Sequence, residues 1–454
     1  MKKVHLIAIG GQGMSGLARI LLEQGCEVSG SDINPSNTTS RLKDLGAEIF
    51  IGHSEQNVGN PDVVVVSSAI SNDNPEVLEA KRKGIPVIHR MDMLLSVLED
   101  KKLITTAGTH GKTTTAAMIA WILEQAGLDP TYLVGGQIGD RGNARLGKGA
   151  YAVVETDESD GSFLKCRGYV NVVTNVDSDH LDYWGSFEAL KEAFFSYLGC
   201  NEDNGLNIVC LDNDYLRDWA DHHPEAIGYA VRNDADWKGE NVSIVGWGSA
   251  CQIEHEGKVV SDLRLNVPGI YNIQNALGAI AAADCIGIEP KDACRYLERF
   301  PGVKRRLERV GEFGGVLIID DFAHHPKEIE AALDAVRSAL PDSRVTVIFQ
   351  PHRYSRTKLL HSEFGLAFRK ADALIVTKIY VGPGEKEDPH VSARAISESV
   401  RSTGNQCVFQ IDDMEEAAKT AVSLVCEGDV IITMGAGDVW KIHSMLRDLL
   451  DQNC

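Results

Sequence analysis

The chain has 454 residues, with 45 Lys and Arg against 65 Asp and Glu, and a formal net charge of −20. Its 43% hydrophobic and 24% charged residues are ordinary for a soluble globular protein and exclude collagen-like and disordered chains. The acidic balance argues against a general nucleic-acid or membrane-surface binder, because those partners reward a basic footprint. At roughly 100–200 residues per domain, the length predicts two to four domains.

The start of the chain and its cysteines predict a cytoplasmic protein. The apolar run from Val4 to Ile9 is too short for a signal-peptide core, and no uninterrupted apolar stretch is long enough to span a bilayer. The ten cysteines include no C-x-x-C pair, so we expect neither a zinc knuckle nor a redox dithiol. We therefore expect reduced and mostly buried thiols.

Strand-like apolar runs alternate with segments of helical periodicity, which is typical of parallel α/β layers. In chain order, the pattern predicts strands at Val4–Ile9, Glu27–Gly30, Val63–Ser67, Pro86–Ile88, Leu103–Thr106, Tyr151–Glu155, Val170–Thr174, Arg344–Phe349, Ala373–Thr377 and Asp429–Thr433. Among the intervening segments, helical spacing is clear in Met14–Gln24, Thr113–Ala126, Lys327–Ala339 and Met414–Cys426.

The strand series restarts twice, at Leu103 after a charged cluster and near Val316 after a basic segment. We therefore predict an α/β protein of three domains, covering residues 1–100, 101–303 and 304–454. Residues 201–266 are more polar and contain short alternating runs, which predict a small mixed sheet appended to the middle domain.

A glycine-rich segment follows the strand that starts at Leu103 and opens a helix, which is the context of a phosphate-binding loop. Lys112 can reach the outer phosphates of a nucleotide, and the Thr113 hydroxyl is placed for Mg²⁺. Thr106 stands where the usual motif has its first glycine, so the loop is a variant. The predicted ATP contacts here are Gly108, Thr109, His110, Gly111, Lys112, Thr113 and Thr114.

A second glycine turn, Gly11-x-Gly13-x-x-Gly16, follows the first strand, and Asp32 follows the second. The spacing matches a dinucleotide-binding fingerprint and would by itself favour an NAD enzyme. Glycines at a helix N-terminus would hold any pyrophosphate, however. A chain with this turn and a separate ATP loop is explained more simply by two ligands, ATP and a nucleotide-linked substrate.

Two acidic clusters end strands that neighbour the phosphate loop. Residues 155–161 follow one strand and residues 174–182, which include His180, follow another. Ligands of α/β sheets bind at the carboxyl ends of strands. Carboxylates and an imidazole at this edge predict a site that holds Mg²⁺ against the oxygens of ATP.

Basic islands stand out in this acidic chain at Lys304–Arg306 and at His352–Arg356. Arginine forks are the usual receptors for carboxylate or phosphate. Asn272 and Asn275 begin a helix rich in small residues, and they either reach a nucleotide base or cap the helix. The adjacent His324 and His325 point different ways, which favours a loop or substrate contact over joint metal ligation.

Taken together, these motifs resemble the Mur ligase family over nearly the whole chain. The segments that carry the resemblance are Gly10–Gly16, Ser29–Asp32, Ser67–Ile70, the Gly108 loop, Asp157–Phe163, Asp179–Tyr183, Asn272–Leu277, Arg305–Arg306, Asp320–Asp321 and Gln350–Arg356. The resemblance implies a Rossmann-like UDP-sugar domain, a central P-loop ATPase-like domain with a parallel sheet, and a Rossmann-like C-terminal domain that closes over ATP.

The resemblance also implies a reaction. The lactyl carboxylate of UDP-N-acetylmuramate takes the γ-phosphoryl group of ATP, and the amine of L-alanine attacks the acyl phosphate in cytoplasmic peptidoglycan precursor synthesis. Neither a nucleic acid nor a membrane is expected as a partner, and the protein is expected to be a monomer or a homodimer.

Residue by residue, the resemblance assigns catalysis to Lys112, Glu155 and His180 and the Mg²⁺ ligands to Thr113, Glu155 and His180, with Glu158 the less favoured glutamate. It places Asn272, Asn275, Arg306 and Asp321 near ATP. It places His352, Arg353 and Arg356 at the amino-acid carboxylate. The UDP-sugar contacts that it implies are Gly11, Gly13, Met14, Ser15, Asp32 and Ser68.

Three positions depart from the family pattern. Phe322 stands where the family usually has Tyr, and Tyr271 stands where it commonly has His. No lysine occupies the position of the carbamylated lysine of sister ligases, since Lys191 is out of register; this absence favours the branch that adds alanine. The alternatives are a ligase that recycles murein tripeptide, an NAD-dependent oxidoreductase, and a non-catalytic nucleotide-binding regulator.

Overall fold

The computed structural model describes residues 2–382 and 385–452, which form two compact units and three β-sheets. The first unit contains the described residues up to Val242 together with Ala250–Leu265 and Asn272–Pro301. The second contains Ser243–Ser249, Asn266–Tyr271 and the described residues from Gly302 onward. Among the described residues, no helix has the length and apolar character needed to cross a membrane.

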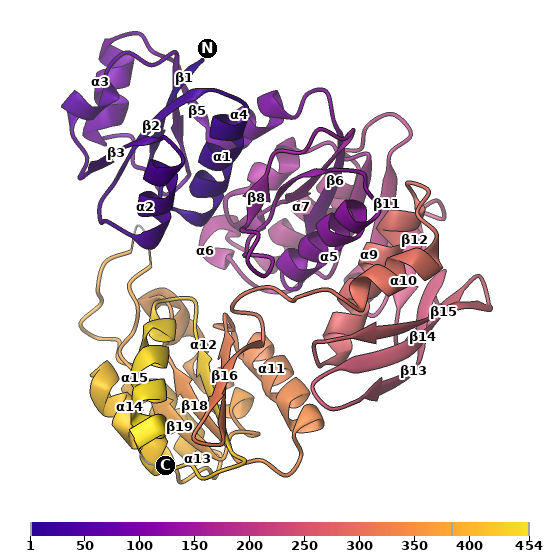
Figure 1. The fold of residues 1–454 in the computed structure, drawn as a ribbon, viewed down its shortest axis with the longest axis vertical. Helices are drawn as coiled ribbons and strands as arrows, with labels where there is room; N and C mark the ends of the chain where they lie inside the picture. The colour runs from indigo at the N-terminus through magenta and orange to yellow at the C-terminus, as the bar shows by residue number, and fades with distance from the viewer. Residues whose placement is uncertain (1, 383–384, 453–454) are drawn as a thin grey trace. The chain divides into compact units, whose positions relative to one another are not determined.

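The N-terminal sheet has five parallel strands in the order β3-β2-β1-β4-β5 (Figure 1). The chain adds β2 and β3 on one side of β1 and then β4 and β5 on the other, so the strand order reverses between β1 and β4. Open α/β sheets bind ligands at such a switch point. The strands are β1 Lys3–Ile7, β2 Glu27–Asp32, β3 Glu48–Ile51, β4 Val63–Val66 and β5 Val87–His89, and the helices are α1 Gln12–Glu23, α2 Asn37–Asp44, α3 Pro75–Arg82 and α4 Arg90–Val97.

The middle sheet has ten strands in the order β15-β14-β13-β12-β11-β10-β6-β9-β7-β8. Its strands are β6 Lys102–Ala107, β7 Thr131–Leu133, β8 Ala144–Arg145, β9 Tyr151–Glu155, β10 Val170–Val173, β11 Leu206–Cys210, β12 Ile227–Ala230, β13 Trp237–Ile244, β14 Ser249–His255 and β15 Lys258–Leu265. The strands expected in residues 201–266 are present, but they form no sheet of their own, because β11 pairs directly with β10 and β12 to β15 extend the middle sheet.

Helices of the middle region are α5 Lys112–Gln125, α6 Leu181–Trp184, α7 Phe187–Leu198, α8 Asp214–Ala220, α9 Ile270–Asp284 and α10 Pro290–Leu297. Helix α5 is buried over every residue from Thr113 to Leu123. A helix that is apolar on all sides belongs inside the protein. The phosphate loop therefore leads into a helix that is fixed by packing from Thr113 onward.

The C-terminal sheet has six strands in the order β16-β17-β21-β18-β19-β20, and only β16 runs antiparallel to its neighbour. Its strands are β16 Glu308–Phe313, β17 Val316–Asp321, β18 Val345–Phe349, β19 Ala373–Val376, β20 Val408–Gln410 and β21 Val430–Met434. Its helices are α11 Pro326–Ala339, α12 Tyr354–Ala367, α13 Arg394–Ser402, α14 Met414–Ser423 and α15 His443–Gln452.

Two hydrophobic clusters cover this sheet, because successive residues of a strand point to opposite faces. One cluster joins Ile319 to Leu333 and Phe364 on α11 and α12, and the other joins Ile318 to Ala418 on α14 and Leu446 on α15. The predicted α/β class with three sheet-centred domains is confirmed. The exact boundaries at residues 100 and 303 stay a prediction.

Candidate active site

The phosphate loop links β6 to α5 and needs glycine at two positions. Gly108 has φ of 130° and Gly111 has φ of 83°, a region that side chains with a Cβ rarely enter. A Cβ on Gly108 would overlap the Thr174 hydroxyl, and one on Gly111 would lie 2.5 Å from Asn275 Oδ1. Gly111 is also the N-cap of α5, so the first N–H groups of α5 face the loop as they do in anion-binding sites.

Thr174 and Asn175, which follow β10, hold this loop through hydrogen bonds. The backbone oxygen of Asn175 accepts a hydrogen bond from the Thr109 N–H at 3.1 Å, and its side-chain oxygen accepts one from the His110 N–H at 2.9 Å. The Thr174 hydroxyl donates to the His110 carbonyl at 2.5 Å. The loop therefore has its shape before any ligand binds, which lowers the ordering cost of binding phosphate.

Lys112 lies inside this loop. Its Nζ donates to the carbonyl oxygens of Gly108 at 2.5 Å and Thr109 at 3.1 Å, and lies 2.8 Å from Glu158 Oε2. Burial opposes the charge on Lys112, but the carboxylates of Glu158 and Asp157 outweigh it and raise the pKa of the ammonium. Burial raises the pKa of the Glu158 carboxyl despite Lys112. The cation is thus held at the loop by a buried carboxylate.

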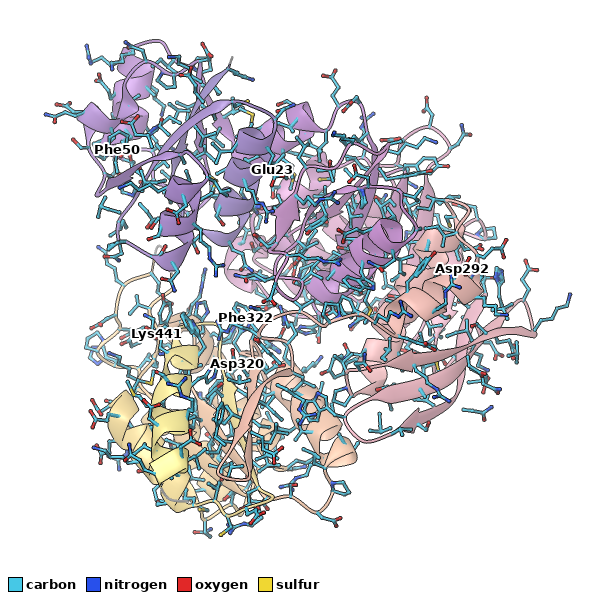
Figure 2. The ribbon with its side chains drawn as sticks, viewed as in Figure 1. Glu23, Phe50, Asp292, Asp320, Phe322 and Lys441 are labelled. Atoms are coloured by element: carbon cyan, nitrogen blue, oxygen red, sulfur yellow. The ribbon has the colours of Figure 1, made fainter. Side chains whose placement is uncertain are left out.

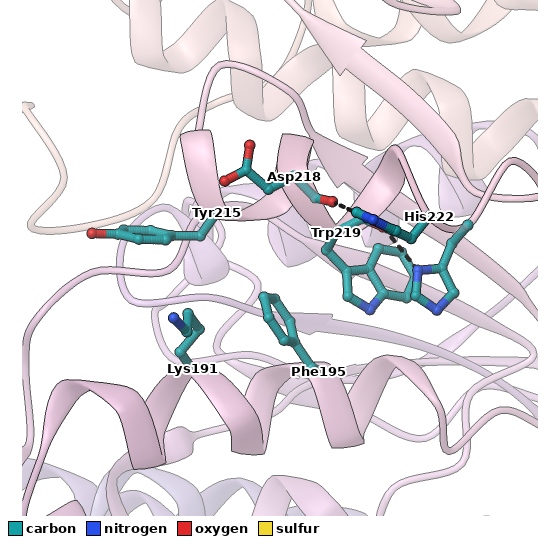
Figure 3. Close-up of a pocket in the computed structure, with 7 residues that line it drawn as sticks. Lys191, Phe195, Tyr215, Asp218, Trp219 and His222 are labelled. Atoms are coloured by element: carbon teal, nitrogen blue, oxygen red, sulfur yellow. Dashed lines mark hydrogen bonds between the residues drawn. The ribbon is translucent and has the colours of Figure 1, made fainter.

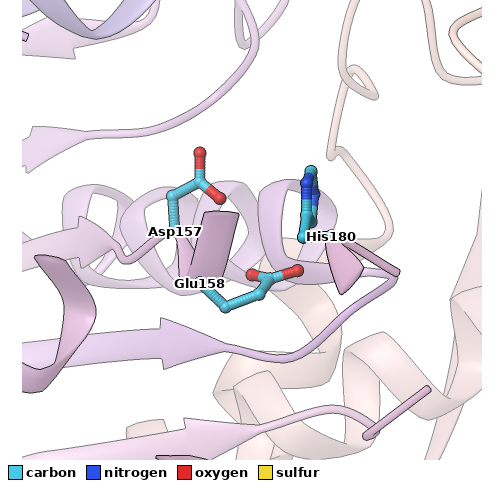
Figure 4. Close-up of side chains that lie close together, drawn as sticks. All are labelled: Asp157, Glu158 and His180. Carbon is cyan, nitrogen blue, oxygen red and sulfur yellow. The ribbon is translucent and has the colours of Figure 1, made fainter. Parts of the chain in front are cut away.

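The two candidate glutamates have different neighbours. Glu155 Oε1 accepts a hydrogen bond from the Thr113 hydroxyl at 2.8 Å, and its other oxygen accepts one from the Gly135 N–H. Asp157, Glu158 and His180, drawn in Figure 4, offer ligand atoms that all lie within 4.8 Å of one another. The sequence-based assignment put Glu155 beside His180, whereas the structure places Glu158 and Asp157 there.

This donor set fits a divalent cation. Hydroxyl and carboxylate oxygens are the ligands that Mg²⁺ prefers, and Thr113, Glu155, Asp157 and Glu158 supply them on one edge of the sheet. Three carboxylates share the region with one ammonium group, so a bound cation would offset their mutual repulsion. Asp157 had no separate role in the sequence-based assignment, although it lies within the same acidic cluster.

The two asparagines of α9 do not cap that helix, since it begins at Ile270, ahead of both. Both side chains are buried, and Asn275 Oδ1 accepts a hydrogen bond from the Thr115 hydroxyl at 3.2 Å. Asn275 therefore supports the loop beneath Gly111. Thr114 is also buried within α5.

At the first glycine turn, Asp32 faces the turn itself. Its Oδ2 accepts a hydrogen bond from the Gly10 N–H at 2.9 Å. Met14 and Ser15 are buried in the first turn of α1, and the Ser15 hydroxyl donates to the Gln12 carbonyl at 3.1 Å. These three residues shape the turn that follows Gly11, while Gly13 and Ser68 lie beside charged groups described below.

In the second unit, aromatic and basic side chains form a row at the carboxyl ends of β17 and β18. The Arg306 guanidinium lies 5.0 Å from the ring centre of Phe322, whose ring lies 5.6 Å from that of His324. Figure 2 labels Phe322 with its neighbour Asp320. The His324 ring lies 5.7 Å from that of His352, and Arg356 Nη1 lies 3.3 Å from His352 Nδ1. The structure thus places Arg306 in one row with His352 and Arg356, two of the predicted amino-acid contacts.

Tyr380 belongs to the same row and was missed from the sequence. Its ring stacks on that of His352 at 5.7 Å, and its carbonyl accepts a hydrogen bond from the Arg353 N–H at 3.0 Å. Tyr380 follows β19, so its position after a predicted strand was the only available signal. Arg353 has φ of 72° and is the N-cap of α12.

Asp321 supports this row from within the protein. Its carboxylate accepts hydrogen bonds from the N–H groups of Leu307 and Ala323, both at 2.7 Å. Burial raises its pKa to about 6 although Arg306 acts against that shift. Next to it, Asp320 Oδ2 accepts a hydrogen bond from Arg305 Nε at 3.0 Å. Asp321 therefore orders the chain that carries Arg306 and Phe322.

Lys191 lies in a separate pocket between α7 and α8, shown in Figure 3. Its Nζ lies 5.7 Å from the ring centre of Tyr215, and none of the predicted site residues lines the pocket. The pocket volume is about 320 Å³, and the lining residues are Lys191, Phe195, Tyr215, Asp218, Trp219, His222 and His223. Lys191 thus contacts neither the phosphate loop nor the carboxylates around it among the described contacts.

Three family models match the chain in succession. The model described as "Mur ligase family, catalytic domain" matches residues 3–102, "Mur ligase middle domain" matches residues 106–283, and "Mur ligase, glutamate ligase domain" matches residues 305–437. Together they include the first glycine turn, the phosphate loop and the row of aromatic and basic side chains.

Individual proteins match over the full length. A UDP-N-acetylmuramate–L-alanine ligase of Geobacter sp. (strain M21) is 42% identical over 97% of this chain and 96% of its own. Its counterpart in Desulfosudis oleivorans is 43% identical over 97% and 96%. The crystal structure of a UDP-N-acetylmuramate–alanine ligase from Thermotoga maritima matches with a TM-score of 0.87 at 30% identity, covering 100% of both chains. A murein peptide ligase from Psychrobacter arcticus matches with a TM-score of 0.73 at 26% identity over 99% of both.

Proposed function

Because this chain belongs to the Mur ligase family, we propose that it joins L-alanine to UDP-N-acetylmuramate in an ATP-dependent reaction. The observation that carries the proposal is the phosphate loop with Lys112 inside it, in a chain 41–43% identical to ligases of that name over nearly its full length. An NAD-dependent oxidoreductase would have no use for Lys112 and the carboxylates around it.

The reaction proceeds in two steps. An oxygen of the lactyl carboxylate attacks the γ-phosphorus of ATP, and the bond from this phosphorus to the oxygen that bridges it to the β-phosphate breaks. The products of this step are ADP and an acyl phosphate. The deprotonated amine of L-alanine then attacks the carbonyl carbon, inorganic phosphate departs, and the nitrogen loses its second proton. Both steps depend mainly on positioning and on neutralising phosphoryl charge.

In this proposal the chain's own groups do that work. The N-terminal N–H groups of α5 and Lys112 hold the outer phosphates. Mg²⁺ would be held by Thr113 and Glu155 and by Asp157, Glu158 and His180, and when bound it would neutralise charge on the transferring phosphoryl group. The donor set of these side chains supports this assignment. The glycine turn after β1 and Ser68 after β4 would hold the UDP-sugar diphosphate at the switch point of the N-terminal sheet.

Cellular placement and assembly are part of the same proposal. The acidic composition and the ten cysteines without a C-x-x-C pair support a cytoplasmic protein, and we expect a monomer or homodimer. Domain boundaries near residues 100 and 303 are supported by family models that end at residue 102 and begin at residue 305.

The experiment that tests the proposal measures phosphate release from Mg·ATP with UDP-N-acetylmuramate and compares two amino donors. We expect release that depends on L-alanine and a product heavier by one alanyl residue. Release only with the tripeptide L-alanyl-γ-D-glutamyl-meso-diaminopimelate would move the protein to the recycling branch. Release with neither donor would reject ligase activity on this sugar.

Replacing Arg353 with alanine should raise the KM for L-alanine. A hydrogen bond from a charged donor is worth about 1.5–3 kcal/mol, which corresponds to a roughly 10- to 150-fold change. Initial rates at varied L-alanine and varied ATP measure it, with Arg369→Ala as a control because Arg369 is exposed on the same unit. A change confined to the KM for ATP would show that Arg353 does not bind the amino acid.

A further inference from the structure

Asp160 of the middle region reaches into the N-terminal sheet. It ends the 3₁₀ turn Glu158–Asp160, which follows β9. Its Oδ2 accepts a hydrogen bond from the Ser68 hydroxyl at 2.5 Å and lies 3.6 Å from His89 Nε2 and 3.8 Å from Arg90 Nη2. The side chains of Asp160 and Arg90 are only 11% and 19% exposed. One carboxylate thus occupies a mostly buried receptor made of a hydroxyl, an imidazole and a guanidinium.

This receptor lies at the place where the N-terminal sheet is built to hold an anion. Ser68 follows β4, and Arg90 begins α4 directly after β5. A Cβ on Gly13 would lie 2.8 Å from Arg90 Nη1, so the guanidinium rests against the glycine turn at the start of α1. A guanidinium beside a helix N-terminus is a phosphate-binding arrangement. His89 and Arg90 were not singled out by any motif in the sequence.

Asp160 fills this receptor by its geometry. Its Oδ1 accepts a hydrogen bond from the Ser162 N–H at 3.0 Å, which leaves Oδ2 for Ser68, His89 and Arg90. The chain therefore places its own anion where a substrate phosphate would be bound.

The same turn also carries the partner of Lys112. Glu158 and Asp160 are two residues apart, and at 3.0 residues per turn of a 3₁₀ helix their side chains point in different directions. The turn is held together by its own bonds: the Gly161 N–H donates to the Glu158 carbonyl at 3.2 Å, and the Ser162 N–H donates to Asp160 Oδ1 at 3.0 Å. Glu158 faces the phosphate loop, while Asp160 faces Arg90, which lies against the glycine turn, so one short segment touches both ligand sites.

We propose that Asp160 is an internal competitor for the UDP-sugar diphosphate, and that its displacement moves the turn and frees Lys112 from Glu158. The inference rests on the proposed function for the identity of the sugar nucleotide. Asp160 is here a positioning residue, since it acts on ATP binding through Glu158. Because coupling between two binding sites is reciprocal, ATP bound at Lys112 strengthens UDP-sugar binding by the same factor.

The test compares wild type with Asp160→Asn, which keeps the shape of the side chain and removes its charge. UDP is titrated calorimetrically, and a non-hydrolysable ATP analogue is titrated with and without saturating UDP at one fixed Mg²⁺ concentration. In wild type we expect UDP to tighten analogue binding at least about fivefold. In Asp160→Asn we expect tighter UDP binding and a coupling factor near one. Asp92→Asn is the matched control, because that exposed carboxylate pairs with Lys165 at 2.8 Å and lies on neighbouring α4.

Unchanged or weaker UDP binding in Asp160→Asn, or an unchanged coupling factor, would overturn the proposal. A second readout needs no variant: UDP should accelerate hydrogen exchange in a wild-type peptide covering residues 157–162, since the turn loses the contacts of Asp160 and Glu158 that hold it in place. Slower or unchanged exchange there would also overturn it. The alanine-dependent phosphate release of wild type is scored separately, so a failed ligase assay and a failed competition between Asp160 and UDP are distinguishable.

Discussion

Replacing Lys112 with alanine lowers turnover by about a thousandfold, the loss typical of removing one preorganised group that stabilises developing charge. Lys112 Nζ is fixed by the Gly108 and Thr109 carbonyls inside the phosphate loop. Water can fill the space that the truncated side chain leaves, but it carries no positive charge. The γ-phosphoryl group would therefore lose a permanent cation. The UDP-sugar receptor belongs to the N-terminal sheet, so the variant should still bind UDP. Its affinity should be no weaker than that of wild type, because the Lys112–Glu158 contact that helps to hold the turn of Asp160 is gone.

Single-turnover phosphate release and calorimetric UDP binding measure the two effects. Lys148→Ala serves as the control, because Lys148 is an exposed lysine of the same unit. Lys112→Arg keeps the charge but not the compact donor and should recover only part of the rate. Because Lys112→Ala leaves Glu158 buried without its cation, the far-ultraviolet spectrum of each variant is compared with wild type. Wild-type turnover in a folded Lys112→Ala protein would refute the assigned role.

Replacing Glu76 with glutamine destabilises the N-terminal sheet by about 1–3 kcal/mol at pH 7, as expected when buried hydrogen-bonding groups lose their partner. Glu76 and His5 are both fully buried, and Glu76 Oε2 lies 2.9 Å from His5 Nε2. The same oxygen accepts a hydrogen bond from the Ser31 hydroxyl at 2.7 Å, and Oε1 accepts one from Asn57 Nδ2 at 2.8 Å. This carboxylate joins β1, β2 and α3 with the loop after β3.

The pH dependence of this contribution follows from the pKa of Glu76. Burial acts to raise it, but hydrogen bonds from His5, Ser31 and Asn57 outweigh burial and lower it from 4.5 to about 2. A carboxyl with a lowered pKa in the folded state binds fewer protons there than in the unfolded state between these values. The stabilisation is therefore complete above about pH 4.5 and is lost as the pH falls towards about 2.

Urea unfolding read by pulsed hydrogen exchange of β1 and β2 peptides measures this difference, because a chain of several domains does not unfold in one step. Glu55→Gln is the matched control, since Glu55 is exposed on the loop after β3. The gap between wild type and Glu76→Gln should shrink between pH 4.5 and pH 2. A gap that persists unchanged at low pH would show that shape, and not charge, accounts for the loss.

Much of the fold was predictable because its signals are local. Val4–Ile9 and Leu103–Thr106 are apolar runs followed by glycines, and the structure confirms β1 and β6 there. The strands at the polar end of the middle sheet were harder to assign. The pairing of β11 with β10 depends on partners 36 residues apart, such as Val170 and Leu206, and no local pattern records which strand a short polar segment will join.

The sequence by itself determined the α/β class, the phosphate loop and the identity of the groups at the strand ends, because glycine conformation, hydrophobic periodicity and side-chain chemistry are properties of short segments. Only the tertiary structure decided which of these groups meet. The 3₁₀ turn after β9 directs Glu158 to Lys112 and Asp160 to Arg90, whereas Glu155 at the strand end meets Thr113. These partners are set by packing between segments far apart in the chain, where a rotation of one residue changes which carboxylate faces which cation.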